Sequence, residues 1–174
     1  GMYMQSLKVL ERIKHIAIEH HQDILHLEIL EFQKLIEARH ITRSRQVKNK
    51  MENLLEESSR RSAVTNYTSL LFNFNIQVHG WYIQHGHARN EKDRQALQSF
   101  YEQHLPRHGP TTKLTFFEKA NLYQAQMWYH YILLDMEACR KSAEAWVLLF
   151  EESPMMREKD PDLYMRSLYY LLVT

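Results

Sequence analysis

Large aromatic side chains recur along this chain at a nearly constant interval. Phe32, Trp81 and Trp128 are separated by 49 and 47 residues. A period of this size is typical of stacked helix pairs, in which each pair buries its apolar side against its neighbours. After each aromatic residue, 25 to 27 positions further on, comes a helix-ending signal: Ser58-Ser59, then Pro106, then Pro154.

The composition also favours helices. The 174 residues include only four Gly and four Pro, whereas residues that lose little side-chain freedom in a helix are abundant. With 44% apolar and 25% charged residues, the composition is that of an ordinary globular protein. We therefore expect one all-α domain over residues 1–174, made of about eight helices. We also expect it to be part of a longer repeat protein, because Gly1-Met2 resembles a tag remnant and the last helix lacks a polar cap.

Apolar spacing predicts three helices in the first third of the chain. The first covers residues 3–20, with Leu7, Leu10, either Ile13 or Lys14, Ala17 and Ile18 inward. Residues 20–23 favour a turn, with Asp23 as the cap of a second helix over 24–39, although one continuous helix is the alternative. That second helix places Leu25, Ile29, Phe32 and Ile36 on one side. A third helix, capped by Thr42 or Ser44, carries Val47, Met51, Leu54 and Leu55 and ends in the polar run 56–62.

The segment from 63 to 85 allows two interpretations. Residues 72–79 alternate apolar and polar, which is the period of a half-buried strand. If the same segment is a helix, its large apolar residues lie on one side; these are Tyr67, Leu71, Phe74, Val78 and Trp81. A lone strand among helices would leave its backbone groups without a ladder partner, so a helix is predicted.

Capping signals mark the remaining helices. Asn90 is an expected N-cap with Asp93 three residues later, and Asp135 is another. Thr115 and Glu118 have the spacing of a capping box, and Asp160-Pro161 combines an N-cap with Pro at the first helical position. Inward positions are expected to be Ala96, Leu97, Phe100 and Tyr101, then Met136, Cys139, Ala143, Trp146 and Phe150.

A repeating unit follows from these predictions: a long helix, then a shorter one. Ala96 and Ala143 would let the paired helices approach closely. The stretch from Trp128 to Ala138, which leads to Pro154, resembles the tetratricopeptide-repeat superfamily. The unit of about 48 residues is longer than the usual 34. The resemblance implies antiparallel helix pairs stacked into a right-handed α-α superhelix, and a scaffold or peptide-binding role.

The sequence contains no clear motif of an enzyme, a metal site or a membrane span. No Gly-rich phosphate loop and no nucleophile motif is present, and the single Cys139 falls on an inward stripe. The eleven His form no pair with metal-ligand spacing, so packing or solvated roles are expected. No apolar run reaches the length of a membrane span. We predict no catalytic activity, no cofactor, no bound metal and a cytoplasmic setting.

Charge does not point to nucleic acid as a partner. The 22 basic and 21 acidic residues are spread evenly over the two halves of the chain. One basic run, without an acidic residue, could contact phosphates or an acidic partner. The favoured interpretation is a solvated face, neutralised by the glutamates at 52, 56 and 57. The run consists of Arg39, Arg43, Arg45, Lys48 and Lys50.

The predicted function is protein–protein interaction, as a scaffold or peptide-binding module. In such repeats the first helix of each pair lines a concave groove, so its polar side supplies the candidate binding residues, although ordinary surface amides are the simpler interpretation. The alternative function is a sensory or regulatory domain that controls a fused effector or nucleic-acid-binding region elsewhere. The candidate groove residues are Asn73, Gln77, Gln84, Gln124 and Tyr131.

Two further expectations concern packing. Trp128 and Trp146 should be buried between helices, because both lie on apolar stripes of one pair. The last helix has an apolar side containing Leu163, Leu168 and Leu172, and part of it would have no partner within the chain. We expect that side either to continue into another repeat or to form a homodimer.

Overall fold

The computed structural model describes residues 2–40, 49–107, 109–110 and 112–174. Within these residues the chain forms eight helices and no strand, which confirms the all-α prediction. The chain divides into two compact units, residues 1–66 and 67–174. The right-handed sense of the predicted superhelix stays a prediction.

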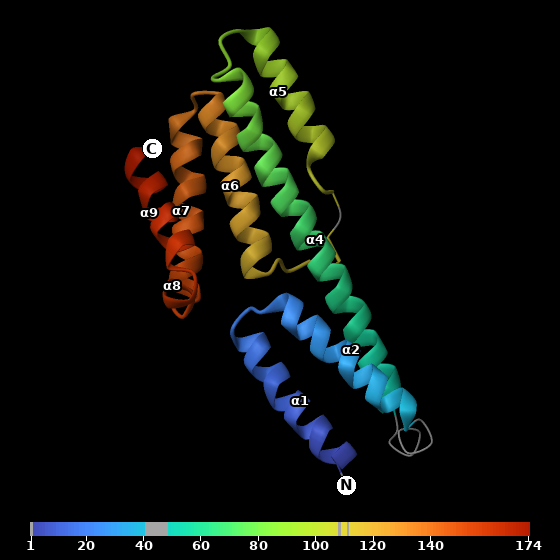
Figure 1. Cartoon of the computed structure of the whole chain (residues 1–174). Helices are drawn as coiled ribbons and strands as arrows, with labels where there is room; N and C mark the ends of the chain where they lie inside the picture. The colour runs from blue at the N-terminus through green and yellow to red at the C-terminus, as the bar shows by residue number, and fades with distance from the viewer. Residues whose placement is uncertain (1, 41–48, 108, 111) are drawn as a thin grey trace. The chain divides into compact units, whose positions relative to one another are not determined.

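The first unit is built from three helical segments. Helices α1 (Met2–Glu19) and α2 (Asp23–Arg39) pack side by side as an antiparallel hairpin, drawn in blue in Figure 1. The turn between them has His21 in the left-handed region, with φ of 51°, so the alternative of one continuous helix is wrong. Asp23 does not cap α2, because its carboxylate bonds Arg61 instead. The third segment is the first part of α4 (Lys50–His85).

Helix α4 corrects the predicted boundary between a third and a fourth helix. It runs unbroken for 36 residues, through the polar run that we expected to end a helix. Neither Gly nor Pro occurs between Lys50 and His79, so nothing in the backbone forces a break. The polar side chains of the run have partners: Glu57 and Ser58 both bond residues of the hairpin. The proposed caps Thr42 and Ser44 lie outside the described residues.

The second unit contains the rest of α4 and five further helices. They are α5 (Glu91–His104), α6 (Phe116–Ile132), α7 (Met136–Glu152), α8 (Met156–Lys159) and α9 (Pro161–Val173). Figure 1 shows α6, α7 and α9 as neighbouring layers, and α7 packs on both α6 and α9. The expected alternation of long and short helices is wrong here, because α6 and α7 both have 17 residues. The short α8 was not predicted.

The predicted caps are confirmed. Asn90 accepts a hydrogen bond from the amide of Asp93, and Asp135 accepts one from Ala138. Thr115 and Glu118 form the complete capping box, with each side chain bonding the other residue's backbone amide. Asp160 caps α9, with Pro at the first helical position.

Two clusters of buried side chains hold the second unit together. One joins α6, α7, α8 and α9 around Trp146 and Phe150, and it contains Cys139 and Ala143. The other joins α4, α5 and α6 around Phe74 and Leu97. Trp146 is completely buried, as predicted, whereas Trp128 is only half-buried between the two clusters.

Several predicted inward positions are wrong. Phe32 is 59% exposed, and Leu25, Ile18 and Leu55 are also exposed. Ala96 is exposed too, so a small residue is not what brings α5 onto its neighbours. In α2 the side turned inward contains His26, Gln33 and Glu37 in addition to Ile29 and Leu30. The reason is that polar side chains of α4, such as Glu57, form hydrogen bonds with polar side chains of this hairpin.

Candidate functional site

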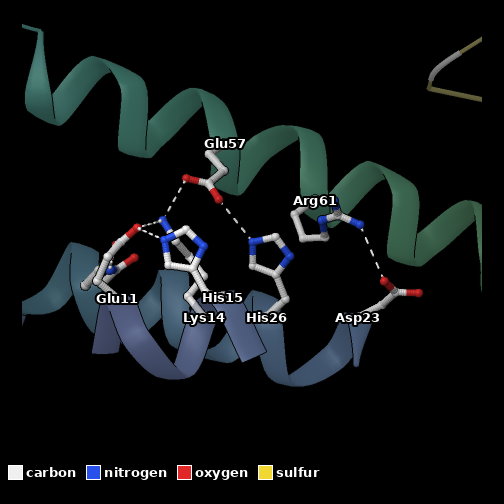
Figure 2. Close-up of polar contacts among 8 residues, drawn as sticks. Glu11, Lys14, His15, Asp23, His26, Glu57 and Arg61 are labelled. Carbon is white, nitrogen blue, oxygen red and sulfur yellow. Dashed lines mark hydrogen bonds and ion pairs between the residues drawn. The ribbon is translucent and has the colours of Figure 1, made fainter. Parts of the chain in front are cut away.

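The interior of the first unit contains an ion-pair network, which is unusual for a helical core. Of the two inward alternatives Ile13 and Lys14, Lys14 is buried, as is Ala17, whereas Ile13 is exposed. Its Nζ lies 3.1 Å from Glu11 Oε1 and 3.2 Å from Glu57 Oε2. Figure 2 shows Glu57 reaching from α4 to Lys14 and, through its other oxygen, to His26 of α2. Arg43, Arg45 and Lys48 of the basic run lie outside the described residues, so its neutralisation by Glu57 stays a prediction.

The network continues on either side of Glu57. His26 Nε2 donates to Glu57 Oε1 at 3.0 Å, and Arg61 lies 3.4 Å from Asp23 Oδ1 (Figure 2). These contacts tie α1 and α2 to α4 through charged groups. The net contribution of such an ion pair to stability is small because both charges lose hydration, whereas removing one partner leaves the other charge uncompensated.

Burial and charge shift the pKa values of this network. Desolvation lowers the pKa of His26 below its ordinary value, and the hydrogen bond to Glu57 opposes this only in part. Desolvation alone would raise the pKa of Glu57, but the hydrogen bond from His26 and the Lys14 charge outweigh it and lower that pKa. Desolvation raises the pKa of Asp23, against the attraction of Arg61. At neutral pH the network therefore holds a neutral His26 beside a charged Glu57.

Acidification should weaken the first unit through His26. Its folded pKa lies below the unfolded value of 6.5, so its stabilising contribution is complete above pH 6.5 and is lost as the pH falls through the folded pKa. The groups that face it are Lys14 from α1, Asp23 from α2, and Glu57 and Arg61 from α4. The pKa of Glu57 is lowered, so Glu57 stays charged between about pH 7.5 and about pH 5.5, and the change at this contact over that range is the protonation of His26.

Urea unfolding at these two pH values measures the effect. We expect His26→Gln to lose less stability on acidification than the native chain does. The control is His15→Gln, since His15 belongs to the same hairpin but its side chain is 69% exposed and lies beside Glu11 instead of Glu57. The loss of stability on acidification should be larger in this control than in His26→Gln. An equal pH dependence in the native chain and His26→Gln would show that His26 does not carry the effect.

A polar pocket lies beside this network. Its volume is about 360 Å³, and all of its lining residues belong to α1, α2 and the first part of α4. Gln33 and Glu37 form part of its wall; Gln33 Nε2 donates to Glu11 Oε2 at 2.9 Å, and Tyr3 donates to Glu37 Oε2 at 2.9 Å. Lys50 forms an ion pair with Glu37. The pocket is therefore an ordered arrangement of paired charges.

The other side of the α1–α2 hairpin is apolar and exposed. Val9, Ile13 and Ile16 of α1 follow each other at helical spacings of four and three, and all are exposed. Leu25 and Phe32 of α2, seven residues apart, are exposed as well. An open groove of about 460 Å³ between the two helices has Val9, Leu10, Phe32 and Ile36 in its walls. We call the five exposed residues, from Val9 to Phe32, the outer hairpin face.

This hairpin departs from the usual amphipathic arrangement. Lys14, His26, Gln33 and Glu37 are buried together with Ala17, Ile29 and Leu30, whereas several large apolar side chains remain exposed. Sequence reasoning missed this because it assigned Phe32 and Leu25 to the core by their hydrophobicity. A signal was present in the sequence: His26, Gln33 and Glu37 of α2 recur at spacings of seven and four, which gives this helix a polar row that would need polar partners if it were buried.

The residues predicted to line a groove lie in different environments. Asn73, Gln77 and Gln84 are exposed on one side of α4. Gln124 is buried, and its Nε2 donates to the carbonyl of Ala120 in its own helix. Tyr131 is half-buried, and its ring packs against aromatic neighbours. None of the pockets found among the described residues is lined by these five side chains. Their role in binding stays a prediction.

Tyr131 belongs to an aromatic group that the sequence did not reveal. Its ring contacts Tyr82, His87 and Trp128, and its carbonyl accepts a hydrogen bond from His87 Nδ1 at 3.0 Å. The hydrogen bond with Tyr82 raises the pKa of Tyr131, with burial adding to it. His79 stacks on Trp128 with ring centroids 4.0 Å apart. These contacts pack α4 against α6 and explain the high aromatic content structurally.

Within ranges 2–40, 49–107, 109–110 and 112–174, no three His, Cys, Asp or Glu side chains gather as a metal site requires. None of the helices in the same ranges has the length and apolar character of a membrane span. Comparison with known proteins found no matching protein family, no matching curated protein and no matching solved structure.

Proposed function

We propose that this chain is a non-catalytic protein-interaction module, and that a partner helix docks on the outer hairpin face. The observation that carries the proposal is the row of large exposed side chains, among them Phe32, Ile16 and Val9. Contiguous apolar patches on a soluble protein typically mark interaction surfaces. Phe32 stands in the wall of the groove and would be its central contact.

The geometry favours a helix as the occupant. Two antiparallel helices border the groove, and their exposed apolar residues recur at three, four and seven positions. An amphipathic helix with the same spacing can interdigitate with both rows. A peptide that binds by strand addition would need a sheet edge, and the described residues contain no strand. The resemblance to tetratricopeptide repeats, which commonly bind peptides, supports the same role.

The lone cysteine fits a non-catalytic role. Cys139 is completely buried, and its thiol lies 3.5 Å from the carbonyl of Met127. Burial raises the pKa of Cys139 to about 11, so its reactive thiolate form is scarce at neutral pH. This thiol behaves as a small core residue of α7.

Selection from a displayed library of 20-residue random peptides tests the proposal. We expect the enriched peptides to have apolar residues at helical spacing and to form a helix when bound. Phe32→Glu should weaken the best peptide by about tenfold or more, since it places a charge in the centre of the groove. Leu148→Glu, on an exposed position of α7, is the matched control and should bind normally.

Three results would contradict this assignment. Enrichment of extended or proline-rich peptides would exclude a helix-binding groove. Peptide binding that Phe32→Glu leaves intact would place the site elsewhere. A dimer in light scattering that Phe32→Glu converts to a monomer would make a second copy of this chain the occupant. The predicted homodimer through α9 is distinguishable, because it would persist in Phe32→Glu and disappear in Leu172→Glu.

A further inference from the structure

Two charged residues of α1 lie on the same side of the helix as its part of the outer hairpin face. Arg12 stands three residues after Val9 and four before Ile16, and Glu19 follows Ile16 by three residues. Residues three and four positions apart are neighbours on a helix surface, and Val9 and Ile16 are both exposed. Arg12 and Glu19 are exposed as well, so they border the apolar row of α1.

The apolar row of α2 is bordered in the same way. Glu28 stands three residues after Leu25 and four before Phe32, and Arg39 follows Phe32 by seven residues, or two helical turns. Both charged residues are exposed. No other Asp, Glu, Lys or Arg of α1 or α2 stands three, four or seven positions from a residue of the outer hairpin face in its own helix. The face therefore has four charged neighbours, two of each sign.

These four charges have no partner among the described residues. None of them forms a side-chain hydrogen bond or an ion pair with another described residue. On the side of the hairpin that faces α4 the situation is different, because Asp23 is paired with Arg61 and Glu37 is paired with Lys50. The charges that remain for a partner are thus those beside the outer hairpin face.

The four charges are sorted by sign along the hairpin. The two helices are antiparallel and meet at the turn, so the number of residues from His21 gives the position along the hairpin (Figure 1). Glu19 precedes His21 by two residues and Glu28 follows it by seven. Arg12 precedes His21 by nine residues and Arg39 follows it by eighteen. Negative charge therefore lies toward the turn, and positive charge lies toward the open end.

We propose that the partner helix of the outer hairpin face carries its charges in two blocks, a basic half over the turn and an acidic half over the open end. The proposal rests on the proposed function, since it specifies which helix the same groove accepts. The acidic half meets Arg12 and Arg39, and the basic half meets Glu19 and Glu28. Complementary charges favour one register and disfavour the arrangement that brings like charges together.

The order of the two blocks also determines the direction in which the helix binds. The exposed apolar residues of α1 and α2 form two antiparallel rows, so apolar packing alone distinguishes the two directions poorly. A helix with an acidic N-terminal half should place its N-terminus at the open end. A helix with a basic N-terminal half should bind the other way round, with its N-terminus at the turn.

Three synthetic helical peptides of about 20 residues test the proposal by titration calorimetry. All have Leu at the same third and fourth positions and equal numbers of Glu and Lys; one is acidic then basic, one is basic then acidic, and one alternates. A hydrocarbon staple on the side away from the leucines equalises their helicity. Both block peptides should bind about fivefold more tightly than the alternating peptide at low salt, since each exposed ion pair contributes little. Roughly 0.5 M NaCl should remove most of this difference.

A nitroxide label on the N-terminus of each block peptide measures the direction. The acidic-first peptide should broaden the methyl NMR signals of Ile36, near the open end, more than those of Leu25, near the turn. The basic-first peptide should do the opposite. This measurement uses the native chain, so it depends on no substitution.

Exchanging the four charges should turn each block peptide round. The exchanged chain keeps its net charge, and its helicity should be retained because all four residues are exposed. The matched control exchanges two exposed charges of the second unit and should bind both peptides in their native directions. The exchange consists of Arg12→Glu, Glu19→Lys, Glu28→Lys and Arg39→Glu, and the control of Arg94→Glu and Glu151→Lys.

The results distinguish this inference from the proposed function. Equal affinities of block and alternating peptides at low salt would overturn the charge order and leave helix docking intact. The same binding direction for both block peptides would overturn it too, as would native directions in the exchanged chain. If none of the three peptides binds, helix docking itself is contradicted, and the charge order with it.

Discussion

Replacing Trp146 with Ala should lower the free energy of unfolding by about 3–5 kcal/mol, as expected for a large core aromatic. Trp146 is completely buried at the centre of the cluster that joins α6, α7, α8 and α9. Its ring stacks near Tyr170 of α9, with centroids 6.1 Å apart. Its indole nitrogen has no hydrogen-bond partner among the described residues, which reduces the loss toward the lower end of the range.

Chemical denaturation followed by circular dichroism measures this loss. Leu148→Ala is the matched control, because Leu148 lies on the exposed side of the same helix and should change stability by no more than about 0.5 kcal/mol. Trp146→Phe should cost less than Trp146→Ala, since it keeps an aromatic ring and removes the unpaired N–H. A loss below about 1 kcal/mol for Trp146→Ala would be incompatible with a central position in the core.

Replacing Glu57 with Gln should destabilise the chain by about 2 kcal/mol. Removing one partner of a buried ion pair costs about 3–5 kcal/mol when the remaining charge is fully enclosed. Two features reduce that figure here: the Glu57 side chain is 30% exposed, and Lys14 keeps Glu11 as a second partner. The amide can still accept the hydrogen bond of His26, so the lost charge accounts for most of the effect.

A double-mutant cycle attributes this loss to the pair. If Lys14 is the charge left behind, Glu57→Gln should cost clearly less in a Lys14→Met background. The matched control is Glu137→Gln, which breaks a fully exposed pair with Lys141 and should leave the free energy of unfolding essentially unchanged. Purely additive losses for Lys14→Met and Glu57→Gln would show that the contact contributes nothing specific.

Local signals were sufficient for the starts of α5, α6, α7 and α9 in the second unit. The caps at Asn90, Thr115, Asp135 and Asp160 are correct because a cap is a contact between residues three positions apart. The inward stripe of α7, with Cys139, Ala143 and Trp146, is correct for a similar reason. Its apolar residues are numerous, and any neighbour would bury the same side.

The first unit shows where sequence reasoning fails. The polar run after Leu55 contains no backbone breaker, and whether it ends a helix depends on partners far away in sequence. Lys14 and His26 supply those partners, 43 and 31 residues from Glu57. The predicted break is wrong because polar composition alone cannot distinguish a loop from a helix with a polar contact surface.

The candidate sites depend on the same long-range choice. Once charged residues of α4 face the hairpin, α1 and α2 turn their polar sides inward, and Phe32 and Ile16 are left exposed. This orientation of α1 and α2 creates both the outer hairpin face and the pocket at Gln33. None of the residues in these two surfaces was predicted to bind a partner. Helix formation and capping depend on residues that are close in sequence, so they can be predicted from the sequence alone. Which side of a helix becomes buried follows from what packs against it, and that information exists only in the folded unit.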